Sequence, residues 1–572
     1  MSETLRSRAW LGDAGKNGFI ARHHLRAMGV SSPLLDGRPI IGIGNTFSEL
    51  TPCNAHLRSL ADSVKRGVLA AGGLPLEFPV MSLGEPFLRP SSMMYRNLMA
   101  MEVEENLRAN PLDAAVLLTG CDKTTPAALM GAASVDLPTM LLTGGPMLNG
   151  KFRGKDVGSG TDIWKMTESL RVGAITQADF TEFETCLNRS PGHCMTMGTA
   201  STMACLTEAL GMQLPGAAAY PAVDSRRTAL AELTGMRAVE LAREQIRPSD
   251  IMTRAALENA VKVNAALGGS TNAVVHLLAL AGRLDVPLTL EDFDTIGRDV
   301  PLLTDLLPSG RFLMEEFAYA GGVPALLRQM ATLLDLNVMT VTGKSLSDSV
   351  ALEAPYDEAV IRDLADPVQP AGSGTAVLRG NLAPDGAVLK ISAASAHLMT
   401  HTGRAIVFDA LQDYLDVADD PDLRVDADTV LVVRNLGPRG YPGMPEVGNL
   451  PMPRRLLQAG ITDMVRVTDA RMSGTAYGTC VLHVAPEAAA GGPLALVHSG
   501  DLVELDAPGR RLNVLVSDEE LARRASEWSA PKPRSTRGWT RLYVDHVTQA
   551  DTGADLDFLV GGSGDTPDRP SF

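Results

Sequence analysis

The chain has 572 residues, of which 45% are apolar and 21% charged, and its formal net charge is −16 at pH 7. This length exceeds what one hydrophobic core usually supports, so we expect two or three domains. The negative charge argues against a nucleic-acid surface, which needs clustered Lys and Arg, and no apolar run reaches the roughly 18 residues of a membrane span.

Six cysteines in a chain of this length do not form a disulfide scaffold. The stretch 1–19 contains no apolar segment long enough for a signal peptide. We therefore expect a cytoplasmic enzyme that acts on small molecules. Its thiols are expected to be reduced and to serve as packing residues, nucleophiles or metal ligands.

Short apolar runs alternate with helical patterns over roughly the first 350 residues. The strand-like runs lie at 39–46, 76–83, 113–120 and 138–145, and helical patterns lie at 56–71, 92–107 and 125–134. From about residue 165 to 335 helical patterns dominate. This alternation predicts a mostly parallel sheet covered on both faces. We assign residues 1–364 to such an α/β domain.

After about residue 365 the chain consists of short β-type runs separated by Gly, Pro and Asp. Examples are GAVLKIS (386–392), TVLVVRNLGP (429–438) and TCVLHVAP (479–486). This spacing predicts a β-rich second domain over residues 365–572, either barrel-like or a sandwich. The boundary is expected within residues 345–372.

Three cysteines share a setting between a strand-like run and a helical one. Cys53 follows the run at 39–46, Cys121 follows the run at 113–120, and Cys194 follows a Pro-Gly turn. A helix N-terminus stabilises a thiolate, and sites in α/β folds lie at strand ends. If the three converge, thiolates favour an iron–sulfur cluster, zinc or copper(I). Of these we expect an iron–sulfur cluster, in which three protein ligands would leave one iron open to a substrate hydroxyl. Three unrelated buried cysteines are the alternative, because no C-x-x-C pair occurs. Three further cysteines lack this setting and are expected to be packing residues: Cys186, Cys205 and Cys480.

Acidic residues in similar loops indicate a second metal. Asp122 and Lys123 directly follow Cys121, Glu85 follows the second strand-like run, and Glu446 lies in a Gly/Pro-rich loop of the second domain. Carboxylate oxygens suit Mg²⁺, which prefers octahedral oxygen coordination. Alternatively, each acid is an exposed loop residue and the lysine is solvated or ion-paired.

Two loops rich in small residues also attract attention. ALGGSTNAVVHLL (266–278) either binds a substrate carboxylate at a helix N-terminus or only caps the helix. DARMSGTAYGTC (469–480) holds Ser473 and Thr475. No G-x-S-x-G elbow surrounds Ser473, which argues against a serine hydrolase.

Taken together, these stretches resemble the dihydroxy-acid dehydratase / 6-phosphogluconate dehydratase family of iron–sulfur enzymes. The motifs that carry the resemblance, in chain order, are TPCN, GCDKTTPA, GGSTNAVVHL, GPRGYPGMPE and RMSGTAYG. FLRPSSMMYRN, LNGKFRGKDVGSGTDIWK, YPAVDSRR and HVTQADTGADLDFL resemble its sugar-acid branch, above all pentonate dehydratases such as L-arabinonate dehydratase. The branched-chain amino-acid enzymes carry an aspartate in an S-D-G context where this chain has Glu85, and that departure argues against the biosynthetic activity.

The resemblance implies a role for each candidate residue. Three thiolates would hold the cluster, expected to be [2Fe–2S]: Cys53, Cys121 and Cys194. Four oxygen ligands would surround a Mg²⁺, one of them a carbamylated lysine: Glu85, Asp122, Lys123 and Glu446. Three residues would contact substrate: Ser473 as the base, Thr475, and His546 from the C-terminal segment.

The implied reaction removes water from a sugar acid such as L-arabinonate or D-xylonate, or from a related 2,3-dihydroxy acid, and yields a 2-keto-3-deoxy acid. The family fold is an α/β N-terminal domain and a β-barrel C-terminal domain with the site between them. The assembly implied is a homodimer or a homotetramer built as a dimer of dimers. Two alternatives remain: a dihydroxy-acid dehydratase of branched-chain amino-acid synthesis, and a non-catalytic iron–sulfur or zinc protein.

Overall fold

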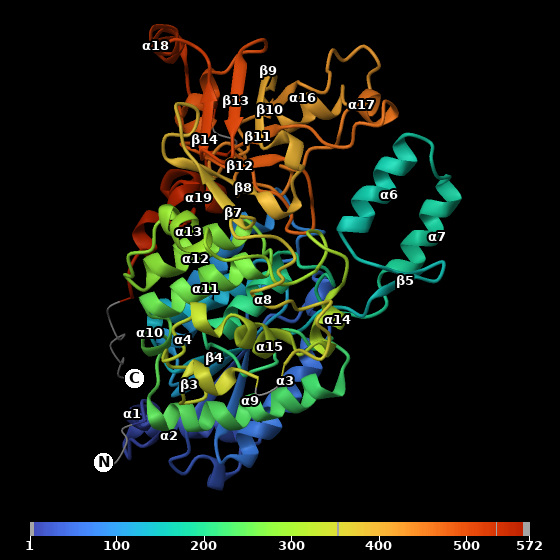
Figure 1. Ribbon diagram of the computed structural model, residues 1–572. Coiled ribbons are helices and arrows are strands. Elements are labelled where there is room, and N and C mark those ends of the chain that lie inside the picture. The colour runs from blue at the N-terminus through green and yellow to red at the C-terminus, as the bar shows by residue number, and fades with distance from the viewer. Residues whose placement is uncertain (1–4, 352–353, 533–534, 564–572) are drawn as a thin grey trace.

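The computed structural model describes residues 5–351, 354–532 and 535–563, which form an α/β half and a β half (Figure 1). The α/β half is built on a parallel sheet with strand order β2-β1-β3-β4. The four strands are β1 (Ile40–Asn45), β2 (Leu74–Pro79), β3 (Ala114–Thr119) and β4 (Thr139–Thr143). Every residue of β1, β3 and β4 is buried, as expected for apolar runs covered on both faces. The predicted runs at 39–46, 113–120 and 138–145 form strands, whereas the run at 76–83 overlaps β2 only over residues 76–79.

Two pairs of helices cover this sheet. The pairs are α3 (Leu57–Ala70) with α9 (Ser225–Glu244), and α4 (Arg96–Ala109) with α5 (Thr124–Val135). Right-handed crossovers place α3 and α5 on opposite faces, because β2 and β4 lie in opposite directions from the sheet centre. The backbones of α3 and α9 touch at two glycines: a Cβ at Gly67 would lie 1.9 Å from the Glu232 carbonyl, and one at Gly235 would lie 2.1 Å from that of Val64.

The remaining helices belong to both the α/β half and the β half. Three of them pack against one another: α8 (Thr199–Ala209), α11 (Arg254–Ala266) and α12 (Asn272–Arg283). The others are α1 (Arg8–Leu11), α2 (Lys16–Ala27), α6 (Thr161–Arg171), α7 (Gln177–Leu187), α10 (Pro248–Ile251), α13 (Leu290–Gly297), α14 (Met314–Tyr319), α15 (Gly322–Gln329), α16 (Leu411–Leu415), α17 (Arg454–Gln458), α18 (Asp518–Glu527) and α19 (Gly538–His546).

The β half contains an eight-stranded mixed sheet in the part of the chain that the structure describes, with order β14-β13-β9-β10-β11-β12-β8-β7. Its strands are β7 (Thr375–Leu378), β8 (Gly386–Lys390), β9 (Thr400–Phe408), β10 (Val430–Val433), β11 (Arg466–Thr468), β12 (Cys480–Ala485), β13 (Leu502–Asp506) and β14 (Arg511–Val514). The sheet nearly closes on itself, because Arg379 beside β7 pairs with Arg511 of β14. Apolar residues such as Leu389, Val432 and Leu512 fill its interior.

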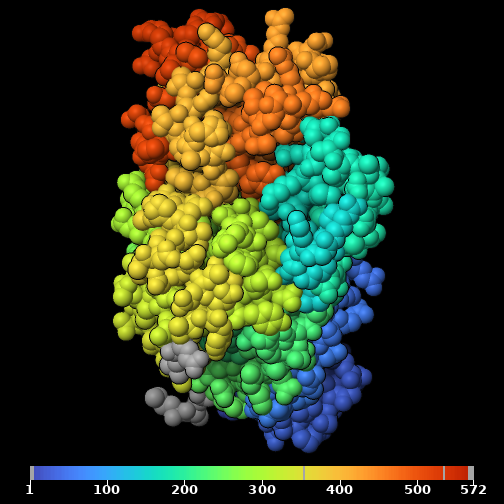
Figure 2. All heavy atoms as spheres, turned by 45° about the vertical axis from the view of Figure 1, so that its right-hand side comes forward, coloured from blue at the N-terminus to red at the C-terminus, as the bar shows by residue number. Residues whose placement is uncertain are grey.

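Two segments extend from one half of the chain and pack against the other half. The β5 (Gly150–Phe152) and β6 (Lys155–Val157) hairpin carries the projecting α6–α7 pair (Figure 1), which lies against the β half in Figure 2. The C-terminal residues return to the α/β half, where Arg96 donates to the carbonyls of Gly553 and Ala554 at 2.9 Å and Arg283 pairs with Asp555. The division at residues 364 and 365 stays a prediction. Among the described residues, no helix is both long and apolar enough to cross a membrane.

Candidate active site

All four strands of the parallel sheet lead to one edge, where the predicted residues gather. Cys53 lies in the turn between β1 and α3, and Glu85 lies in the loop after β2. Cys121, Asp122 and Lys123 lie between β3 and α5. Parallel strands end at the same edge of a sheet, so their following loops meet there.

Cys194 also lies at this edge, although it does not directly follow a strand of the parallel sheet. The backbone N–H of His193 donates to the Gly145 carbonyl at 3.0 Å, and the N–H of Met147 donates to the His193 carbonyl at 2.8 Å. The segment before Cys194 is therefore paired with the residues that follow β4. Cys194 then precedes α8, so all three cysteines have the setting that their sequence context indicated.

The three thiols lie near one another. The contact with Cys121, followed by burial and the nearby Cys194 and Asp122, raises the pKa of the Cys53 thiol well above its ordinary value. Burial, together with Asp122 and Cys121, raises the pKa of Cys194 to about 12. Thiols in this state are protonated near neutral pH, and a soft metal centre bound among them would displace those protons. A set of three sulfur ligands fits an iron–sulfur cluster.

Three carboxylates surround one buried ammonium beside the thiols. One carboxylate oxygen each from Glu85, Asp122 and Glu446 lies within 4.8 Å of the other two. The Nζ atom of Lys123 is 3.0 Å from Glu446, 3.2 Å from Glu85 and 3.5 Å from Asp122, and its side chain is fully buried. Hard oxygen donors this close together fit a divalent cation such as Mg²⁺.

Glu446 is the most tightly held of the three acids. Its Oε1 accepts from Lys123, from Asn272 Nδ2 at 2.6 Å and from Arg471 Nη1 at 2.8 Å. Burial nevertheless raises the pKa of Glu446 to about 7, with the neighbouring Glu85 acting in the same direction. Burial also acts to raise the pKa of Glu85, but Lys123 and Arg471 outweigh it and hold that pKa below the ordinary value.

Arg471 connects the loops that carry the two glutamates. Its guanidinium is fully buried and also donates to the Met444 carbonyl at 2.7 Å and to the Ser91 hydroxyl at 3.2 Å. The adjacent Ser92 hydroxyl donates to Glu85. One cation from the β half therefore supports acids contributed by both halves.

Ser473 and Thr475 lie at the rim of this cluster. The Ser473 hydroxyl is 3.0 Å from that of Thr475. Ser473 lines a pocket of about 490 Å³ together with Glu85, Glu446 and Trp164. That volume is within the range of small-molecule sites, and the pocket opens onto both the acids and the serine.

His546 is not brought to the pocket by contacts in this chain. It ends α19, its side chain is 41% exposed, and its Nδ1 is 3.0 Å from Asp557 Oδ1. It is not among the residues that line the pocket. Its contact with substrate stays a prediction.

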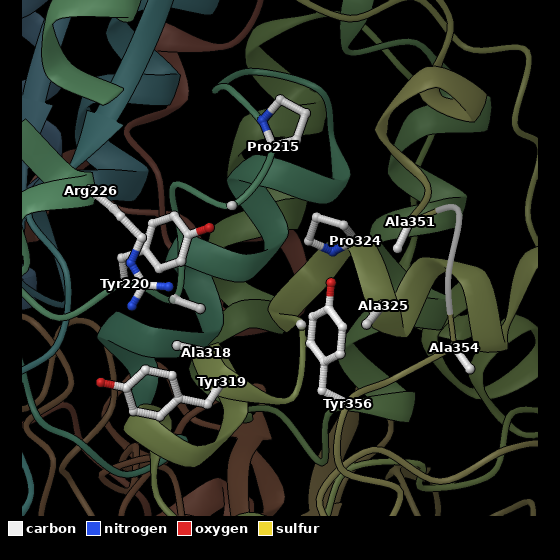
Figure 3. Close-up of a pocket in the computed structure, with 13 residues that line it drawn as sticks. Pro215, Tyr220, Arg226, Ala318, Tyr319, Pro324, Ala325, Ala351, Ala354 and Tyr356 are labelled. Carbon is white, nitrogen blue, oxygen red and sulfur yellow. The ribbon is translucent and has the colours of Figure 1, made fainter. Parts of the chain in front are cut away.

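A larger cavity of about 610 Å³ lies elsewhere on the α/β half, among Tyr220, Tyr319 and Tyr356 (Figure 3). The Arg226 guanidinium stacks on the Tyr220 ring at 4.2 Å and pairs with Asp224 at 2.6 Å. None of the residues that line this cavity is a predicted site residue.

Three residues of the site escaped prediction from the sequence. Arg471 is the first residue of the RMSG stretch. A single charged residue among small residues was the only sequence signal for its role. Asn272 lies in the 266–278 loop, whose glycines and polar residues were noted, but it contacts Glu446. Trp164 gave no local signal, because its place in the pocket depends on how α6 docks.

Comparison with known proteins identifies the family of the chain. Residues 38–349 match the dihydroxy-acid/6-phosphogluconate dehydratase N-terminal domain, and residues 359–554 match the C-terminal domain. The chain is 58% identical over 569 residues to an L-arabonate dehydratase of Azospirillum brasilense, covering 98% of this chain and 97% of that protein. It is 55% identical over 569 residues to an L-arabinonate dehydratase of Rhizobium leguminosarum bv. trifolii, covering 99% and 98%. It is 48% identical over 571 residues to a 6-deoxy-6-sulfo-D-gluconate dehydratase of Pseudomonas putida, covering 99% and 98%. The chain therefore belongs to the dihydroxy-acid/6-phosphogluconate dehydratase family and is a dehydratase, a hydro-lyase.

Proposed function

We propose that this enzyme dehydrates a sugar acid, an aldonate such as L-arabinonate or D-xylonate or a related 2,3-dihydroxy acid, to a 2-keto-3-deoxy acid. The observation that carries the proposal is a pocket lined by Glu85, Glu446 and Ser473. The two glutamates of this pocket also contact the buried Lys123 and lie beside Asp122. The similar proteins that are named for L-arabinonate and L-arabonate support this substrate class.

We propose that Cys53, Cys121 and Cys194 hold an iron–sulfur cluster of the [2Fe–2S] type expected from the sequence, and that four oxygen ligands bind Mg²⁺. Those ligands are Glu85, Asp122, Glu446 and a carbamylated Lys123. When bound, the two centres supply Lewis acidity at the substrate carboxylate and at the departing hydroxyl.

Charge balance makes carbamylation of Lys123 depend on a bound cation. In the unmodified chain its ammonium and Arg471 face three carboxylates. Carbamylation replaces the ammonium with an anion, so four negative groups then face Arg471 alone. Such a set is stable at this degree of burial only with a divalent cation among them.

The chain's own groups account for proton removal and substrate orientation. Ser473 Oγ, as an alkoxide, would take the proton from C2 of the sugar acid. Nearby positive charge favours the alkoxide, and Arg471 lies two residues earlier in the same loop. Asn272 and Arg471 fix Glu446, so the acids keep their geometry while substrate binds.

A substrate panel tests the proposal. The purified, metal-replete enzyme is incubated with L-arabinonate, D-xylonate, D-gluconate and 2,3-dihydroxyisovalerate, and 2-keto acids are measured with semicarbazide or thiobarbiturate. We expect the highest kcat/KM with a pentonate. Conversion of 2,3-dihydroxyisovalerate alone would establish the branched-chain activity instead. Zinc without iron and sulfide, with no turnover of any acid, would establish the non-catalytic alternative. Assembly as a homodimer or dimer of dimers stays a prediction that light scattering can check.

A further inference from the structure

The α6 helix forms one wall of the active-site pocket, although it belongs to the projecting hairpin. Its N-terminus is seated on the serine loop: Thr161 Oγ1 donates to the Thr475 carbonyl at 2.7 Å. At Gly160, where φ is +86°, a Cβ would lie 2.1 Å from Thr475 Oγ1, so the Gly160 backbone lies directly against the Thr475 side chain. Only glycine suits that position.

The distal part of α6 is also fixed to the β half. The Tyr477 hydroxyl donates to Glu168 Oε2 at 3.1 Å, and Arg171 Nε donates to Asp419 Oδ1 at 3.2 Å. Figure 2 shows the hairpin lying against the β half. Helix α6 is therefore held at both ends, and the side chain it presents to the pocket, Trp164, has a defined position.

We infer that Trp164 determines substrate specificity by packing against the carbon chain of the sugar acid beyond C3. This inference rests on the proposed function. The acids and Ser473 occupy the reacting end of the pocket and must engage the carboxylate, C2 and C3. The half-buried indole is part of the remaining wall, beside Arg89 and Tyr441.

An aromatic wall suits this task because an indole offers a large apolar surface with a polar edge. The C–H groups at C4 and C5 of a pentonate would contact the ring, whereas glycerate ends at C3 and leaves the ring exposed to water. One carbon in such a pocket is worth roughly 10- to 200-fold in kcat/KM. Trp164 therefore separates long from short acids that share the same reacting carbons.

The indole N–H has a second, separable effect. Nε1 donates to Thr475 Oγ1 at 3.4 Å, and Thr475 in turn contacts Ser473 Oγ at 3.0 Å. Trp164 is thus also a positioning residue for Ser473. Loss of the N–H alone should lower kcat for long and short acids by the same factor, while loss of the ring should change their ratio.

Two substitutions and one control test this inference. Trp164→Leu removes the ring, and Trp164→Phe keeps a ring without the N–H. Trp528→Leu removes a half-buried tryptophan at the end of α18 that does not line the pocket. For each protein, kcat/KM is measured with L-arabinonate and with glycerate. We expect the pentonate-to-glycerate ratio to fall at least about tenfold in Trp164→Leu and to stay within about threefold in the other two.

An unchanged ratio in Trp164→Leu, with a wild-type enzyme that prefers the pentonate, overturns the inference and leaves the proposed function intact. A wild-type enzyme that dehydrates no sugar acid overturns both. Should Trp164→Leu not fold, Ser473→Ala protein labelled with 5-fluorotryptophan provides the test by ¹⁹F NMR. The Trp164 resonance, identified with Trp164→Phe, should shift with L-arabinonate and not with glycerate. Equal shifts, or none, overturn the inference.

Discussion

Replacing Lys123 by methionine removes a charge on which the metal-free site depends. At an effective dielectric constant of about 20, each of its three contacts at 3.0–3.5 Å contributes about 5 kcal/mol of attraction. Without the ammonium, three carboxylates remain within 4.8 Å, and each pair repels by about 3 kcal/mol or more. Desolvation offsets much of the lost attraction, and breaking one side of a buried ion pair costs about 3–5 kcal/mol net. We expect a destabilisation of that size for metal-free Lys123→Met at pH 8.

The loss of folding stability in metal-free Lys123→Met, relative to wild type, should depend on pH with a definite sign. Burial already raises the pKa of Glu446 to about 7, and loss of Lys123 raises it further. A carboxyl whose pKa is higher in the folded state binds protons on folding, so it loses stability as pH rises through that pKa. The deficit of Lys123→Met should therefore be smaller at pH 6 than at pH 8, and Mg²⁺ should restore part of it.

Urea unfolding of chelator-treated protein, followed by tryptophan fluorescence at both pH values, measures this deficit. Lys123→Arg is the matched control, because it keeps the cation and should keep the pH dependence of the wild type. Both variants should be inactive after metals are restored, since neither side chain can be carbamylated. Equal midpoints for Lys123→Met and wild type at pH 8 would refute the electrostatic reasoning. Activity in Lys123→Arg would refute carbamylation.

Three further predictions follow from the site. Changing any of Cys53, Cys121 or Cys194 to Ser should abolish the visible absorption of the iron–sulfur cluster. The control Cys186→Ser lies on the surface helix α7 and should keep that absorption. Visible absorption that persists in all of the first three variants would contradict the cluster assignment. Chelation of divalent cations should stop turnover without bleaching the protein, and Mg²⁺ or Mn²⁺ should restore it; turnover that survives chelation excludes the carboxylate site from catalysis. Ser473→Ala should keep the cluster, lower kcat at least about 100-fold and lose exchange of the substrate's C2 proton with D₂O. A kcat within a few fold of wild type would place the catalytic base elsewhere, and Thr475 is the next candidate.

Most secondary structure could be predicted because it depends on local pattern. The run at 113–120 has five consecutive apolar residues, 114–118, and it forms β3, which is buried on both faces. The β-type runs of the second half each became a strand because Gly, Pro and Asp delimit them. Strand order could not be predicted, since β9 lies between β13 and β10, which are distant in sequence. The choice between barrel and sandwich depended on one nonlocal pairing, that of Arg379 with Arg511.

The same distinction holds for the site. Residues that directly follow strands, such as Asp122, could be placed together because parallel strands end at one edge. Glu446 and Ser473 come from the other half, so only the family resemblance associated them with that edge. Arg471 and Trp164 act through tertiary contacts that no local pattern encodes.

The buried ionic cluster also bears on why the two halves are joined as they are. Lys123 and Glu85 come from the α/β half, whereas Glu446 and Arg471 come from the β half, so the pairs that organise the site are contacts between halves. Such pairs contribute little to stability, because desolvation of each charge offsets the attraction, and apolar residues of similar volume would hold the halves together at least as well. Their presence at the interface is therefore not explained by stability, and it fits the catalytic role proposed for them. On the proposed function, a cation bound to Glu85, Asp122 and Glu446 would also link the halves, so metal binding and the docking of the β half onto the parallel sheet would be thermodynamically coupled.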